Sequence, residues 1–281
     1  MYVYLASVLT VLLVASPAKP CPLTSPCFCN EMTGVISCSH RNLTEIPHIT
    51  PSDTVYTRLI LNGNLLTQIP SDAFAGLHVS QIQVRQNPQL TLVRSGAFRS
   101  LPDLQDLILD KNGIVTIETE AFTDLPQLRR LWLSGNSIKS LDNATFVNLP
   151  SLVDLSLDKN AITRIENEAV VNSSNVQRFD VSNNSLTSLD HRVICGWEGL
   201  HILNLSHNPL ECDCSLSWVQ VWRQGHVIGS NVRREVVGTC RDGDSGGEAG
   251  LYVHVFRDCQ VIAHFGVCDG DTDSAVIQPV G

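Results

Sequence analysis

The chain has 281 residues, a formal net charge of −9 and ten cysteines. This acidic balance argues against nucleic-acid binding as the main activity, because binding to a phosphate backbone requires a basic face. A chain of this length ordinarily contains one or two globular domains, but an internal repeat array is built unit by unit and departs from that rule.

Residues 1–18 read MYVYLASVLTVLLVASPA, an apolar stretch that ends in small residues. It is too short for a comfortable membrane span and suits a secretion signal cleaved near Ala18. A short anchor is the alternative, because no Lys or Arg precedes the apolar run. No other stretch is long and apolar enough to cross a bilayer, so we expect a secreted, extracellular protein without a stable membrane span.

Residues 19–55 form the first cysteine-rich region, with Cys21, Cys27, Cys29 and Cys38. In an exported protein such a cluster predicts disulfide bonds, although the spacing alone does not fix the pairing. The other six cysteines all follow residue 194, so the middle of the chain contains none. We expect this first region to cover the open end of the repeats that follow it.

Residues 56–208 repeat the frame L-x-x-L-x-L-x-x-N seven times. The asparagines that close the frame are 23 to 25 residues apart, and a second column of apolar residues keeps a spacing of 24. The first column is Asn64, Asn87, Asn112, Asn136, Asn160, Asn184 and Asn208, and the second is Phe74, Phe98, Phe122, Phe146, Val170 and Ile194. Two columns that share one period indicate an internal repeat.

Apolar residues alternate within each copy of the frame, which predicts a short strand with one buried face. The rest of each copy returns the chain to the next strand, so seven parallel strands should line the concave side of a curved solenoid. The Asn amides should bond main-chain groups in the turn after each strand, and the Phe column should stack inside. An added residue at Pro88 and Gln89 predicts a small outward bulge, either a contact loop or, as we favour, drift in a tolerant turn.

Residues 209–259 form the second cysteine-rich region, which begins with the phrase NPLECDC. Trp218 and Trp222 are four residues apart, so both should lie on one face of a short helix that covers the last repeat. We interpret both Trp residues as core rather than as binding residues. Residues 260–281 form an acidic tail without the hydrophobic end of a lipid-anchor signal.

The 24-residue frame, the four-cysteine start and the phrase NPLECDCSLSW resemble the extracellular leucine-rich repeat family with cysteine-rich flanks, over about Cys21 to Cys259. This family includes variable lymphocyte receptor-like, Slit-like and Nogo-receptor-like ectodomains. The resemblance implies an α/β-type repeat solenoid: a curved leucine-rich repeat horseshoe with a parallel concave sheet and disulfide-stapled caps. It also implies the bonds Cys21–Cys29, Cys27–Cys38, Cys212–Cys240 and Cys214–Cys259.

Cys195 and Cys268 fall outside the disulfide pattern that the resemblance implies. They either bond to each other, which we favour, or Cys268 joins two chains in a disulfide-linked oligomer.

Three patterns suggest chemistry that their surroundings do not support. The segment GDSGG at Gly243–Gly247 matches the nucleophile motif of trypsin-like proteases around Ser245, but a repeat array lacks the two-barrel context that the motif needs. Asp269, Asp271 and Asp273 resemble the start of a calcium loop whose later Gly and Glu are missing. The nine histidines show no paired ligand spacing. We therefore expect no enzyme, no metal and no cofactor.

The x positions of each strand should face out of the core and tile the concave face. Among them Trp132, beside Ile108 and flanked by Arg129 and Arg130, predicts an exposed, apolar and basic patch, because Trp and Arg are frequent in interface hot spots. A single tolerated surface Trp is the alternative. The predicted ligand-binding residues are Arg58, Ile60, Gln81, Gln83, Arg85, Asp106, Ile108, Arg129, Arg130, Trp132 and Asp154.

Five sequons of the form N-x-S/T predict glycosylation of a secreted chain. They begin at Asn42, Asn143, Asn172, Asn183 and Asn204. Asn204 falls in the central concave column and Asn183 at its margin. Glycans at these two positions would shield the C-terminal part of the face and direct a ligand to the first five strands.

Two functions fit these features. The first is a secreted, non-enzymatic recognition protein that binds a protein or glycan on its concave face, plausible in pattern recognition or lymphocyte-receptor-like immunity. The second is an extracellular matrix or cell-guidance protein that binds a growth factor or receptor. The scaffold fixes the frame and leaves the x positions free, so the sequence does not name the ligand.

Overall fold

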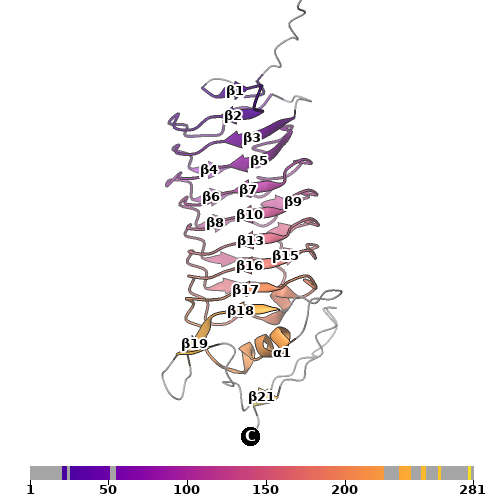
Figure 1. Cartoon of the computed structure of the whole chain (residues 1–281). Helices are drawn as coiled ribbons and strands as arrows, with labels where there is room; N and C mark the ends of the chain where they lie inside the picture. Colours follow the sequence, from indigo (N-terminus) through magenta and orange to yellow (C-terminus); the bar gives the residue numbers. More distant parts are fainter. Residues whose placement is uncertain are drawn as a thin grey trace, which may run out of the picture.

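The chain folds into a solenoid in which each repeat adds one strand to a single long sheet (Figure 1). The computed structural model describes residues 21–23, 26–50, 55–224, 234–241, 248–250, 259–260 and 278–279. The sheet has ten strands in the order β1-β2-β3-β5-β7-β10-β13-β16-β17-β18. Their bounds are Phe28–Asn30, Val35–Ser37, Tyr56–Ile60, Val79–Gln83, Asp106–Ile108, Arg130–Trp132, Asp154–Ser156, Arg178–Asp180, Ile202–Asn204 and Glu235–Val237.

The seven copies of the sequence frame form the seven strands from β3 to β17 in this order, so the predicted repeat solenoid is confirmed. Neighbouring strands are parallel and keep one register, with Leu107 opposite Leu131 and Leu131 opposite Leu155. The constant repeat length therefore places equivalent residues side by side. An amino acid that recurs in the frame becomes a continuous column across the sheet.

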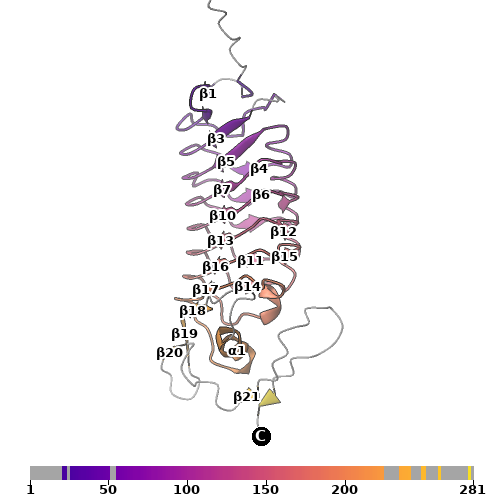
Figure 2. The ribbon, with the colours of Figure 1, turned by 45° about the vertical axis from the view of Figure 1, so that its right-hand side comes forward.

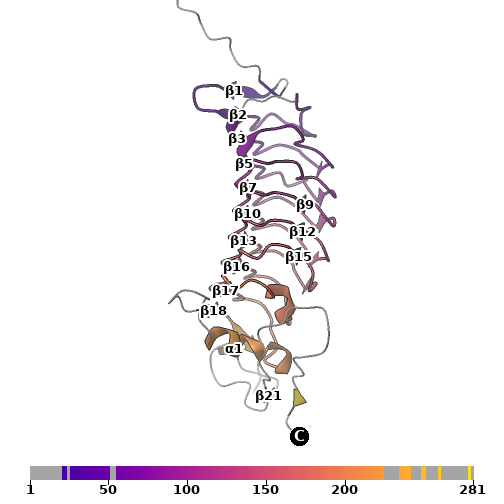
Figure 3. The ribbon, with the colours of Figure 1, turned by 90° about the vertical axis from the view of Figure 1, so that its right-hand side faces the viewer.

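The segments that return the chain from one strand to the next contain short strands rather than long helices (Figure 2). These pair in three small parallel sheets, β4-β6-β8, β9-β12-β15 and β11-β14. Their bounds are Gln68–Ile69, Leu92–Val93 and Thr116–Ile117, then Phe122–Thr123, Phe146–Val147 and Val170–Val171, then Ser140–Leu141 and Arg164–Ile165. Figure 3 shows the main sheet along one side of the solenoid and β9, β12 and β15 along the other.

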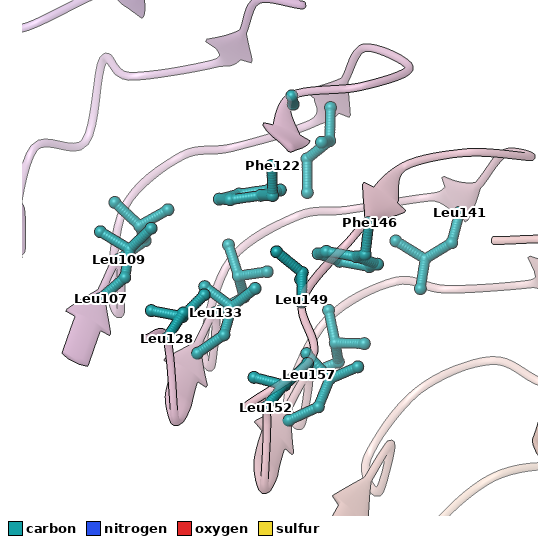
Figure 4. Close-up of a cluster of buried hydrophobic side chains, with 14 of the residues drawn as sticks. Leu107, Leu109, Phe122, Leu128, Leu133, Leu141, Phe146, Leu149, Leu152 and Leu157 are labelled. Atoms are coloured by element: carbon teal, nitrogen blue, oxygen red, sulfur yellow. The ribbon is translucent and has the colours of Figure 1, made fainter. Parts of the chain in front are cut away.

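The core lies between the main sheet and the return segments, and it is built of columns. Figure 4 shows leucines of successive repeats, such as Leu109, Leu133 and Leu157, in parallel rows beside the rings of Phe122 and Phe146. The predicted Phe column is confirmed as a stack, with ring centroids 5.2 Å apart for Phe74–Phe98, 5.3 Å for Phe98–Phe122 and 5.2 Å for Phe122–Phe146.

The ladder of asparagines satisfies main-chain groups in the turn after each strand, as expected. Asn112 donates from Nδ2 to the carbonyl oxygens of Val84 and Leu109, both at 2.7 Å, and its Oδ1 accepts the N–H of Asn87 at 2.8 Å. Each amide therefore ties two repeats together. The residue before the Asn adopts left-handed backbone angles even where it is not glycine, as at Lys111 with φ 56°.

The N-terminal cap continues the sheet. Strands β1 and β2 form an antiparallel hairpin, and β2 pairs in parallel with β3, the first strand of the repeats. The expected bonds Cys21–Cys29 and Cys27–Cys38 are both present. The hairpin thus covers the open end of the core and is held by two disulfides.

The C-terminal cap joins the other end of the sheet through β18, which is parallel to β17. The predicted helix is α1, Trp218–Gln224, and both Trp218 and Trp222 are buried, which confirms their core role. The Cys212–Cys240 bond is present and Cys195 is disulfide-bonded. The remaining elements are η1 (His191–Ile194), η2 (Cys214–Leu216), β19 (Thr239–Arg241), β20 (Glu248–Gly250), β21 (Cys259–Gln260) and β22 (Gln278–Pro279).

Several predictions concern residues outside the described ranges. These are the secretion signal at 1–18, the GDSGG segment, the bond between the side chains of Cys214 and Cys259, Cys268, and the acidic residues of the tail. Within the described ranges, no helix is long and apolar enough to span a membrane.

The added residue of the second repeat forms an exposed turn at Pro88 and Gln89, on the outward side as expected. The main-chain carbonyl of Pro88 lies close to Gly113 of the next repeat. A Cβ atom built on Gly113 would lie 2.4 Å from the Pro88 carbonyl oxygen, although Gly113 has no left-handed backbone angle. Gly113 is therefore required by close approach rather than by conformation.

Candidate functional site

The concave face is formed by side chains that alternate with the buried leucines of the main sheet. In β10 the pattern is exposed Arg130, buried Leu131 and half-buried Trp132. Because the register is constant, two columns run across the face, one through Asp106, Arg130, Asp154 and Arg178 and one through Ile108, Trp132, Ser156 and Asp180. The strands thus bring the predicted residues Asp106 to Asp154 together on one surface.

Three predicted positions are less exposed than expected. Ile108 and Asp106 are 6% and 9% exposed and belong to the buried set, and Trp132 is half-buried. Parallel strands are only about 4.8 Å apart, so the long side chains of Gln83 and Trp132, which flank Ile108 in the register, cover it. At the centre of the face the accessible apolar surface therefore comes from Trp132.

The basic character predicted around Trp132 is reduced at Arg130, which is paired with a carboxylate, whereas Arg129 is exposed. The Arg130 guanidinium donates from Nε and Nη2 to the two carboxylate oxygens of Asp106, at 2.5 and 2.6 Å. This hydrogen bonding raises the pKa of Arg130 further. The same guanidinium lies 5.7 Å from the centre of the Trp132 ring, a cation–π distance. Arg130 therefore orders the tryptophan rather than offering a free charge.

A chain of hydrogen bonds extends from this pair toward the N-terminal strands. Asp106 accepts from Gln81 at 3.3 Å, and Gln81 accepts from Gln83 at 2.9 Å. Gln83 accepts in turn from Asn62 at 3.5 Å. The N-terminal half of the predicted site is thus a connected polar surface, whereas Arg58 is exposed and Ile60 half-buried at its edge.

Asp154, on β13, carries one of the two buried side-chain atoms of the predicted site that lack a hydrogen-bond partner among the described residues; the other is Nε of Arg85. The atom of Asp154 is Oδ1. Burial raises the pKa of the Asp154 carboxyl, against the smaller opposing effects of Arg178 and of hydrogen bonding from Trp132. In the register Asp154 lies between Arg130 and Arg178.

A second polar row follows the strands, at the position after the third leucine of the frame. Asp158 accepts hydrogen bonds from the hydroxyls of Ser134 and Ser156, the latter at 2.8 Å. The Ser134 N–H donates to Asp110 at 3.1 Å, and burial raises the pKa of that carboxyl. Of this row only Arg85 was among the predicted binding residues, although Asp or Ser recurs there at intervals of 24 residues.

The other predicted residues lie around this centre. Arg129 is exposed just before β10, and Arg85 is half-buried with Nη2 3.6 Å from Asp110. Of the sequons, Asn42, Asn143, Asn172 and Asn183 are exposed, and Asn204 is half-buried with its Nδ2 donating to Asp180 at 2.9 Å. The geometry thus places four sequon side chains within reach of solvent.

The described residues show no group of three or more His, Cys, Asp or Glu side chains that could hold a metal ion. Two carboxylates on the face accept hydrogen bonds from neighbouring side chains, Asp106 from Arg130 and Asp158 from two serines. The arrangement is suited to forming hydrogen bonds, ion pairs and one aromatic contact with a partner.

Comparison with known proteins gives consistent matches. The leucine rich repeat profile matches residues 56–114, 102–162 and 151–210, which together span more than half of the chain. Chondroadherin-like protein of Homo sapiens is 39% identical over 83 residues, which cover 27% of this chain and 10% of that protein. Leucine-rich repeat-containing protein 3 of Danio rerio is 42% identical over 71 residues, 25% of each chain.

The chain therefore matches a tenth to a quarter of the length of these relatives. Among solved structures, that of the Toll–Spatzle complex, described as a hub in Drosophila development and innate immunity, has a TM-score of 0.55 at 23% identity. This match covers 66% of this chain and 24% of that chain. At this identity the likeness is one of fold.

Proposed function

Because the chain belongs to the leucine-rich repeat family, we propose that it is a non-enzymatic recognition protein that binds an extracellular protein on its concave face. Repeat solenoids present an extended concave surface to their partners, and function resides in the residues placed on that surface. The disulfide bonds in both caps fit an oxidising, extracellular setting.

The observation that carries this proposal is Trp132. It is half-buried on the open face of the sheet, where the guanidinium of Arg130 lies near its ring and the carboxylate of Asp106 holds that guanidinium. A rigid aromatic ring among ordered charges is the composition of an interface hot spot. We place the centre of the contact on β7, β10 and β13, with Arg58 and Ile60 at its N-terminal margin.

The proposal takes the partner to be a protein rather than a glycan, and immune recognition to be the first role to test. The Toll structure is a complex with another protein, as its description says, although its likeness to this chain is one of fold only. Binding to a matrix component or a growth factor is the alternative role. Glycans at Asn183 and Asn204 would confine either partner to the N-terminal strands.

The test is a binding screen with the full secreted chain against microbial surface preparations and a panel of host extracellular proteins. For any partner found, Trp132→Ala should weaken binding at least about tenfold, the loss of a hot-spot side chain. Arg130→Ala should also weaken it, because the ring loses its ordered neighbour.

Arg164→Ala is the matched control. Arg164 is also an exposed arginine that contacts an aspartate, Asp142, but it lies on β14 in a return segment. Its removal should leave binding unchanged. Full binding by Trp132→Ala and Arg130→Ala would show that the partner uses another surface.

A further inference from the structure

Asp154 has a carboxylate oxygen that nothing in the described structure satisfies. Oδ1 is buried without a hydrogen-bond partner, in a side chain that is only half-buried as a whole. A buried acceptor without a donor is unfavourable, and most such groups in folded proteins have a partner. A hydrogen-bond donor to Oδ1 of Asp154 would therefore be favourable.

The Trp132 indole hydrogen-bonds the Asp154 carboxyl, but the surrounding polar groups leave its Oδ1 without a donor. The guanidinium of Arg130, opposite Asp154 in the register, is bound at both ends by Asp106. The hydroxyl of Ser156, two residues along the same strand, donates to Asp158 at 2.8 Å. On the far side Arg178 is exposed and influences Asp154 through its charge. The missing donor is thus to be sought in a partner molecule.

The charges of the surrounding surface indicate the kind of donor. On the adjacent strands β7, β10, β13 and β16 the face carries three carboxylates and only two guanidinium groups, and the whole chain has a net charge of −9. The three carboxylates are Asp106, Asp154 and Asp180, and the two guanidinium groups are those of Arg130 and Arg178. Such a surface attracts a cation and repels an anion.

Trp132 supplies the second contact for such a group. It lies on the neighbouring strand, diagonal to Asp154, since Trp132 is opposite Ser156 in the register and Asp154 is opposite Arg130, and its side chain is half-buried. Lysine and arginine side chains pack their apolar stems and charged ends against aromatic rings. The carboxylate of Asp154 can thus pair with the charged end of a long basic side chain, and the ring of Trp132 can pack against its apolar stem.

We propose that Asp154 and Trp132 form a receptor for a lysine or arginine side chain of a basic protein partner. The inference rests on the proposed function, because it names the chemistry of the partner at the concave face. Binding requires the Asp154 carboxylate to turn outward, and the terminal torsion of aspartate is soft enough to allow it. An acidic glycan or an acidic protein segment is disfavoured at this position.

The experiment uses the full isotope-labelled chain and small probes. Nα-acetyl-arginine methylamide and Nα-acetyl-lysine methylamide are titrated while the indole N–H resonance of Trp132, assigned with Trp132→Phe, and the carboxyl resonance of Asp154 are followed by NMR. Both resonances should shift saturably with either cationic probe. A sulfated disaccharide, titrated in the same way, should leave them in place.

Asp154→Asn should weaken binding of the arginine probe by about tenfold, the effect of losing a charged acceptor. Asp142→Asn, which removes one carboxylate from a return segment, should bind the probe as well as the wild type. The wild-type carboxyl resonance of Asp154 gives an answer even if Asp154→Asn does not fold.

The absence of a saturable shift, equal binding by Asp154→Asn, or a response to the sulfated disaccharide in place of the cations would overturn the inference. These outcomes are independent of the proposed function, since no protein partner is present. If the probes fail while Trp132→Ala still abolishes binding of a protein, the concave face is the site but a basic side chain is not what it receives.

Discussion

The Phe column offers a direct measure of what stacking adds to burial in this solenoid. Phe122 is fully buried and has a stacked ring on each side, at 5.3 Å to Phe98 and 5.2 Å to Phe146. Phe74 is equally buried but begins the column, with one stacked neighbour at 5.2 Å. A change to leucine removes one stacked pair at Phe74 and two at Phe122.

Each aromatic pair contributes about 0.5–1.5 kcal/mol beyond the burial of its area. Phe122→Leu should therefore destabilise the chain by about 0.5–1.5 kcal/mol more than Phe74→Leu does. Both costs should stay below the ~3–5 kcal/mol of a phenylalanine-to-alanine change in a core, because leucine fills most of the space.

The measurement is equilibrium urea unfolding of the disulfide-intact chain, followed by tryptophan fluorescence. The slopes of the unfolding free energy against urea must agree among the variants, so that the difference reports stability alone. An equal or larger cost at Phe74 would refute the reasoning, because it would show that burial and local shape outweigh the stack.

Two further variants test close contacts described above. Gly113→Ala should destabilise the chain by about 1–3 kcal/mol, because the new methyl group would collide with the backbone carbonyl of Pro88. Gly199→Ala is the control and should be almost neutral, because the nearest atom to its new methyl group is 3.7 Å away. Equal melting temperatures of the two variants would contradict this. Burial raises the pKa of Asp154 above that of the unfolded chain, so ionisation of this group costs stability as the pH rises from the unfolded-state pKa to the folded-state pKa, and the cost is full above the latter. Asp154→Asn should thus be more stable than the wild type at neutral pH, with the gain fading as the pH falls through the folded-state pKa and absent below the unfolded-state pKa. A more stable wild type at neutral pH would contradict this.

The frame of the solenoid could be predicted because it depends on residues that repeat. The Asn ladder, the Phe stack and the parallel register all follow from one constant spacing, and each is confirmed. The left-handed backbone before each ladder Asn could not be foreseen, because Lys111 and Lys159 occupy positions where Gly63 and Gly135 stand in other repeats.

The candidate site was harder to predict because it depends on lateral neighbours. Alternation indicates which side of a strand a residue faces, but the depth at which it lies depends on the length of the side chains on both adjacent strands. Ile108 is buried for that reason. The pairing of Arg130 with Asp106 did have a signal, since the two are 24 residues apart and therefore side by side.

The cap strand β18 shows a different limit. It follows a connection that has no counterpart in the repeats, so no periodic spacing predicts that Val236 pairs with Leu203. The helix before it could be predicted from Trp218 and Trp222, because two aromatic residues four apart on a short segment have a local geometric meaning.

Because the register is constant, most neighbouring repeats present equivalent residues to each other; the second and third repeats are an exception. Between Leu131 and Leu155 a copy of the 24-residue unit could be inserted or removed, and every strand would still meet an equivalent neighbour. Recombination there would lengthen or shorten the face without disturbing the core. Between β5 and β7 the carbonyl of Pro88 leaves no room for a Cβ atom at position 113, so a unit inserted between these two repeats would also need a glycine at that position.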